Sequence, residues 1–213
     1  MTKLKSGDEG SALLAALLAS SLLASLGLAL AGSASMEVIL ASNHRAGTQA
    51  SYAADAAAEA VLADVLMTSN WTDILGGVVV SQLSGSTQLP GLPGAPSLTL
   101  GQLTTMVQAQ SSAAGSWGAD TPQWRVFAHG WISELAAAAP IADDQFLVAW
   151  VADDVGETDG NPFVDTNSRV QFIARAINTQ GMQRTVGMTT AQTIELTNNG
   201  IPGVRVLAWR EVR

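Results

Sequence analysis

The sequence predicts an α+β protein in which a long N-terminal helix packs on a C-terminal antiparallel β-sheet. Two observations indicate this fold. The first third of the 213-residue chain is rich in Ala and Leu and contains no proline, which favours a long helix. The last third holds segments rich in β-branched and aromatic residues, separated by turn residues, and this pattern favours strands joined by hairpins.

Residues 11–35 are predicted to form a membrane-spanning helix. The 26 residues from 11 to 36 carry no charge and include nine leucines, and about 20 apolar residues suffice to cross a bilayer. Lys3 and Lys5 precede this segment, so the positive-inside rule places the N-terminus in the cytoplasm and the rest of the chain outside. The alternative is a secretory signal peptide that is cleaved among the small residues 31–35.

The helix is expected to continue as an amphipathic helix over residues 36–67. Apolar residues recur there at helical spacing, while acidic residues fall elsewhere around the helix. The predicted apolar stripe consists of Tyr52, Ala56, Ala60 and Val61. We therefore expect one continuous helix from residue 11 to about residue 66, with only a local kink near Gly27, Gly32 or Asn43.

Residues 68–125 are predicted to be an irregular connecting region, because Gly and Pro punctuate them densely. Residues 78–80 suit a short strand, and residues 98–110 suit either a strand or a short helix. Residues 126–213 are predicted to form the antiparallel sheet domain. Its strands are expected at 145–152, 169–178, 182–190 and 204–209, with hairpin turns at 178–181 and 198–200.

Two side-chain patterns refine the predicted sheet. Alternation in the last strand predicts that one side of the sheet carries Val204, Val206 and Ala208, and the other Arg205, Leu207 and Trp209. Tryptophans in small domains often fill the space between helix and sheet, and on this ground Trp150 and Trp209 are expected in the core.

Composition excludes several classes of protein. Hydrophobic residues make up 47% of the chain and charged residues 13%, which is too apolar for a disordered protein. The formal net charge is −8, and no cluster of Lys or Arg is present that would bind nucleic acid. The absence of cysteine excludes disulfides, thiolate metal sites and cysteine nucleophiles. No nucleotide-binding or catalytic-triad motif is recognisable, so we expect no enzyme.

Seven oxygen-bearing residues gather between two predicted strands: Asp153, Asp154, Glu157, Asp159, Asn161, Asp165 and Asn167. Carboxylates this close in sequence repel one another unless solvent or a cation compensates them, and calcium prefers several oxygen ligands from a flexible loop. The calcium interpretation assigns as ligands Asp153, Asp154, Asp159, Asn161 and Asp165. The alternative is a solvated loop in which Asp and Asn serve turn formation.

The N-terminal pattern resembles the class III signal peptide of type IV prepilins. It combines a short basic leader, a glycine, a Leu/Ala-rich helix and an amphipathic extension. The resemblance implies that residues 1–10 are a cytoplasmic leader, which prepilin peptidase removes between Gly10 and Ser11. It also implies a pilin-like fold.

Further segments are similar to PilX-type minor pilins: an Asn-x-Arg element at 43–45, Ala-Ala-Asp-Ala at 53–56, and the stretches 146–154, 159–162 and 172–176. The resemblance implies a minor pilin that primes type IV pilus assembly at or near the fibre tip, with a role in adhesion. Implied partners are other minor pilins, the major pilin, prepilin peptidase and the inner-membrane assembly platform. The protein would lie in the inner membrane before assembly, and at the pilus tip or cell surface afterwards.

One position departs from the pilin pattern. Most pilins carry a glutamate five residues into the mature chain, and that position, counted from Gly10, is Ala15. The departure favours a tip or priming position over a major subunit. It is shared by K-type pseudopilins of type II secretion, which are one alternative. A secreted binding module with an ordinary signal peptide is another.

Overall fold

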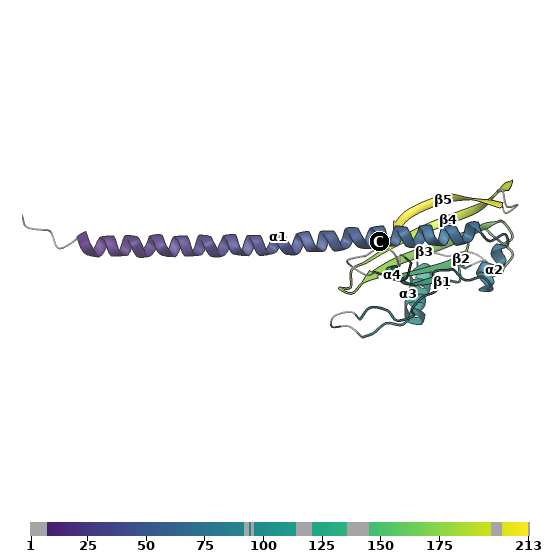
Figure 1. Cartoon of the computed structure of the whole chain (residues 1–213), viewed down its shortest axis with the longest axis horizontal. Coiled ribbons are helices and arrows are strands. Elements are labelled where there is room, and N and C mark those ends of the chain that lie inside the picture. The colour runs from purple at the N-terminus through teal and green to yellow at the C-terminus, as the bar shows by residue number, and fades with distance from the viewer. Residues whose placement is uncertain are drawn as a thin grey trace, which may run out of the picture. The chain divides into compact units, whose positions relative to one another are not determined.

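A computed structural model describes residues 8–91, 94, 96–113, 121–135, 145–196 and 202–212. Five strands form one antiparallel sheet in chain order, β1-β2-β3-β4-β5, preceded by the long helix α1 (Figure 1). The elements are α1 (Asp8–Leu66), α2 (Trp71–Gly76), α3 (Leu100–Ala113), β1 (Arg125–Trp131), α4 (Ile132–Leu135), β2 (Gln145–Asp153), β3 (Arg169–Asn178), β4 (Gln183–Leu196) and β5 (Pro202–Val212). The predicted α+β fold is confirmed.

The chain divides into two compact units, Met1–Ala46 and Gly47–Arg213, and the described part of the first unit is the first part of α1. This part is long and apolar enough to cross a membrane. The nine leucines of residues 11–36 are between 57% and 76% exposed. Three serines donate their hydroxyls to backbone carbonyls three or four residues earlier: Ser20 to Ala16, Ser21 to Leu18 and Ser25 to Leu22. Such bonds satisfy the hydroxyls in an apolar environment.

In the second unit, α1 packs on the sheet through small side chains. The buried face consists of Ala50, Ala53, Ala54, Ala57, Ala58, Val61 and Val65. The predicted stripe is therefore wrong at Tyr52, which is 71% exposed, and at Ala56, which is also exposed, whereas Val61 is buried as predicted. Alanine occupies positions on several sides of this helix, so the sequence pattern alone did not distinguish the packed side.

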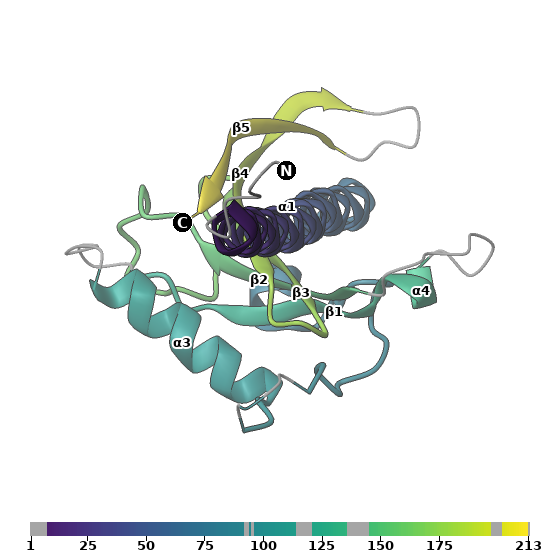
Figure 2. The same ribbon diagram turned by 90° about the vertical axis from the view of Figure 1, so that its left-hand side faces the viewer.

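The sheet is covered on both faces by helices. Alternate residues of β2 point to opposite sides: Leu147, Ala149 and Val151 join the cluster with α1, whereas Phe146, Val148 and Trp150 join a second cluster with Leu103 and Val107 of α3. Figure 2 shows α3 and the packed part of α1 on opposite sides of the sheet. Burial on both faces explains the continuous apolar run of β2. Trp150 is fully buried, as predicted, and its Nε1 donates to Thr104 Oγ1 at 2.9 Å.

The connecting region is more regular than the sequence indicated. It contains α2 and α3, and residues 78–80 form no strand. Helix α3 resolves the choice left open for residues 98–110. Its start carries a capping box, in which Gln102 N donates to Thr99 Oγ1 and Thr99 N donates to Gln102 Oε1.

Strands β3 and β4 are joined by the turn predicted at residues 178–181. The side-chain oxygen of Asn178 accepts the N–H groups of Gln180 and Met182 there, and Gly181 has a φ of 85°. The second predicted turn, 198–200, lies outside the described residues.

Strand β5 occupies the edge of the sheet and pairs only with β4 among the described strands. Val204 and Val206 pack against the core cluster, in agreement with the predicted alternation. A register shift between Thr189 and Thr190 then interrupts the alternation, and Ala208 is exposed. Trp209 is 42% exposed, so its predicted place in the core is wrong. An edge strand has no neighbour on its outer side to cover such a ring.

Candidate functional site

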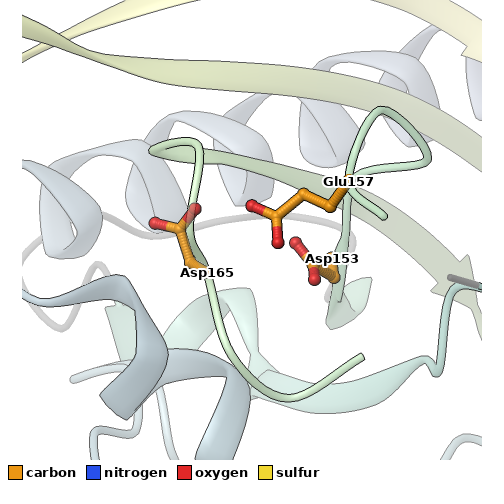
Figure 3. Close-up of side chains that lie close together, drawn as sticks. All are labelled: Asp153, Glu157 and Asp165. Atoms are coloured by element: carbon orange, nitrogen blue, oxygen red, sulfur yellow. The ribbon is translucent and has the colours of Figure 1, made fainter. Parts of the chain in front are cut away.

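The most unusual polar site lies in the loop that joins β2 to β3. Asp153 is the last residue of β2, Glu157 lies early in the loop, and Asp165 lies shortly before β3 begins at Arg169. Oxygen atoms of these three carboxylates all lie within 4.8 Å of one another. Asp153 and Glu157 are 1% and 5% exposed, and Asp165 is half-buried. Figure 3 shows the three side chains converging, with Glu157 between the other two. We call these three residues the acidic cluster.

Glu157 is held rigidly by donors from the second half of the loop. Its Oε1 accepts the backbone N–H groups of Thr166 and Asn167, each at 2.7 Å. Its Oε2 accepts the hydroxyl of Thr166 at 2.9 Å. These charge-assisted bonds fix the carboxylate and draw the two ends of the loop together.

Asp165 connects the loop to two other elements. Its Oδ1 accepts the N–H of Arg169 at 3.1 Å, at the start of β3. Its own N–H donates to Thr72 Oγ1 at 3.1 Å, which ties the loop to α2. The position of this carboxylate therefore depends on the packing of α2 as well as on the loop.

Asp153 is the least satisfied member of the acidic cluster. Its Oδ1 accepts the N–H of Asp154 at 2.9 Å. Its Oδ2 is buried and has no hydrogen-bond partner among the described residues. A buried carboxylate oxygen without a partner is unfavourable when it is charged.

The electrostatics of the cluster reflect this burial. Burial, and next the nearby Glu157 carboxylate, raise the pKa of Asp153 from 3.8 to about 7. Burial likewise raises the pKa of Asp165 to about 6, although the N–H groups of Arg169 and Ser168 oppose the rise by stabilising its charged form. The cluster thus brings three carboxyl groups together in a largely buried loop, where burial favours the protonated forms of Asp153 and Asp165.

The structure brings together two of the five ligands that the sequence suggested, Asp153 and Asp165. The Asp154 carboxylate is used elsewhere: Oδ1 accepts Asn167 Nδ2 at 2.6 Å, and Oδ2 accepts the N–H of Gly156 at 3.0 Å. Asp159 and Asn161 are exposed, and their side-chain oxygens accept N–H groups two residues later in the loop. They serve turn formation.

Glu157 takes the place of those residues in the cluster. It belongs to the acidic run but was not among the five ligands assigned from the sequence. No sequence signal separated it from Asp159, because the spacing within a loop does not fix which side chains turn inward.

The processing junction suggested by the sequence lies in α1. Gly10 and Ser11 are exposed near the start of this helix. A Cβ added at Gly10 would meet no atom within 4 Å, so the glycine is not required by packing. Most of the leader, including Lys3 and Lys5, lies outside the described residues.

Comparison with known proteins does not extend these observations: no protein-family profile, no curated protein and no solved structure matches the chain. Function is therefore inferred from the apolar helix, the sheet domain and the acidic cluster.

Proposed function

We propose that this chain is a minor pilin of a type IV pilus, which primes assembly and lies at or near the fibre tip. The observation that carries the proposal is the composition of α1. Residues 11–36 of this helix are uncharged, rich in leucine and exposed, and the helix continues without a break into a part whose alanines pack on an antiparallel sheet. One helix thus serves as an anchor and as a core element.

The exposed leucines require an apolar environment. Burying a leucine side chain contributes about 1.5–3 kcal/mol, so leaving nine of them in water costs on the order of 10 kcal/mol or more. A bilayer supplies such an environment, with the N-terminus in the cytoplasm as the positive-inside rule implies. The apolar helices of other pilin subunits would supply it after extraction from the membrane.

The surface of the helix also suits contact with other helices. Small residues are frequent between the leucines, among them Ala15, Ala16, Ala19, Gly27 and Gly32. Small side chains let helix backbones approach closely where no hydrophobic driving force between helices exists, as in a membrane. The proposed partners are other minor pilins and the major pilin.

The proposal is tested by the mature N-terminus of the protein. The full chain is expressed in cells that contain prepilin peptidase, and its N-terminal peptide is identified by mass spectrometry. We expect a start at Ser11. A start after residues 31–35 would show that an ordinary signal peptidase acts on the chain, and would overturn the proposal.

Gly10→Leu provides a matched control for this experiment. A Cβ at position 10 would meet no atom within 4 Å, so we expect the variant to change the cleavage junction and to leave the sheet domain intact. The variant is expected to keep its leader and to fail in pilus assembly. Cleavage at the same bond in the variant would contradict the assignment of the junction.

Ala15 favours a second candidate, a K-type pseudopilin of a type II secretion system, because that class also lacks the glutamate at this position. The two candidates differ in the machinery that they complete. Restoration of pili in a strain without its own minor pilins favours the first, and restoration of protein secretion in a strain without its own K-type subunit favours the second.

A further inference from the structure

We propose that Asp153, Glu157 and Asp165 bind one divalent cation, for which calcium is the expected ion. This inference does not depend on the proposed pilin function, because it rests on the loop between β2 and β3 alone.

The spacing of the carboxylate oxygens fits a single ion. Calcium lies 2.3–2.6 Å from its oxygen ligands, so two ligands of one ion are at most about 5 Å apart. The three carboxylates offer oxygens that all lie within 4.8 Å of one another. Each pair therefore meets this limit without any movement of the backbone.

A second observation, independent of the clustering, is the orphaned oxygen of Asp153. This side chain is 1% exposed, and its Oδ2 has no hydrogen-bond partner among the described residues. Buried polar atoms in folded proteins nearly always have a partner. The oxygen belongs to a side chain that faces Glu157, as Figure 3 shows, so an ion between the two carboxylates would supply that partner.

The remaining contacts pre-arrange the site for an ion. Glu157 is fixed by three donors from Thr166 and Asn167, and Asp165 by the N–H of Arg169. Hydrogen bonds of this kind orient ligand carboxylates in metal sites.

The donor set selects the class of ion. All three ligands are carboxylates, and the group contains no histidine. Oxygen ligands suit calcium, magnesium and manganese, whereas zinc prefers nitrogen and sulfur. Calcium takes six to eight oxygens in flexible geometry, and water can complete such a set around ligands from an irregular loop. Magnesium requires a stricter octahedral arrangement, so we expect it to bind more weakly.

The test uses the full chain in detergent micelles, stripped of metal with a chelator. Calcium binding is measured by isothermal titration calorimetry. Thermal unfolding is followed by tryptophan fluorescence in calcium, in magnesium and in sodium chloride at matched ionic strength. An ion that binds only the folded state lowers the unfolding equilibrium constant about a hundredfold when its free concentration is a hundred times Kd. The Tm should therefore rise in calcium and much less in the other two salts.

Asp153→Asn is the diagnostic variant, because it keeps the shape of the side chain and removes its charge. It should fold in chelator and bind calcium at least tenfold more weakly than the wild type. Asp165→Asn should behave in the same way, and it replaces Asp153→Asn if the latter fails to fold. Asp159→Asn is the matched control: it removes the same charge from an exposed position in the same loop and should bind calcium as the wild type does.

Three results would overturn the proposal. The first is a wild-type chain that binds no calcium at about 10 mM, which is ten times the weakest dissociation constant of extracellular calcium modules. The second is a Tm that responds equally to all three salts, because general screening would then explain the effect. The third is equal loss of calcium binding in Asp159→Asn and in the two cluster variants.

Discussion

The packing of α1 on the sheet can be tested by enlarging one alanine. Ala57 is fully buried in the core cluster, whereas Ala56, the next residue of the same helix, is exposed. Leucine at position 57 adds three carbon atoms to a side chain that is completely buried, and overpacking of this kind costs about 1–3 kcal/mol. For a domain of this size, each kcal/mol lowers Tm by about 2–4 °C. We therefore expect Ala57→Leu to lower Tm by about 2–12 °C.

Ala56→Leu is the matched control, since it makes the same chemical change with the same helix propensity. It should leave Tm within about 2 °C, because exposed substitutions usually change stability by less than 0.5 kcal/mol. Both variants of the full chain are unfolded in detergent and followed by tryptophan fluorescence, which the buried Trp71 and Trp150 report. If Ala56→Leu destabilised the protein more than Ala57→Leu, the buried face described for α1 would be wrong.

Three further predictions follow from the core, the acidic cluster and the anchor. Trp150→Phe should lower the free energy of unfolding by about 1–3 kcal/mol in urea titrations, because it leaves a cavity and removes the bond to Thr104. In chelator, the free energy of unfolding should fall as pH rises from about 4 to about 7 and then level off, because the folded state holds protons on Asp153 and Asp165 that the unfolded state releases. Urea unfolding midpoints at pH 5 and pH 8 measure this change. A higher midpoint at pH 8 would contradict the prediction. Deletion of residues 11–34 should leave a soluble protein that does not restore pili in a complementation assay, and restored pili would refute the assembly role of this segment.

Much of the fold could be predicted from local sequence patterns. The long helix and four of the five strands, β2 to β5, follow from composition, periodicity and turn residues, because these features act over a few residues. The capping box of Thr99 and Gln102 was also present in the sequence, and it would have decided between strand and helix for residues 98–110. Local patterns did not determine features that depend on tertiary contacts. These are the side of the alanine-rich helix that packs on the sheet, and the exposure of Trp209 on an edge strand.

The acidic cluster shows a similar division. The sequence identified the loop, because five carboxylates lie within 13 residues. Which of them converge depends on the path of the loop backbone, and that path is set by contacts with distant residues such as Thr72 in α2. For this reason Glu157 lies in the cluster, while Asp159 is exposed.

The burial of β2 on both faces has a consequence for cooperativity. Leu147, Ala149 and Val151 belong to the cluster beneath α1, and Phe146, Val148 and Trp150 belong to the cluster beneath α3. Neither cluster can be dismantled without disturbing the strand that completes the other. The second unit should therefore unfold in a single transition, in which the amide protons of β2 exchange with solvent only through global opening.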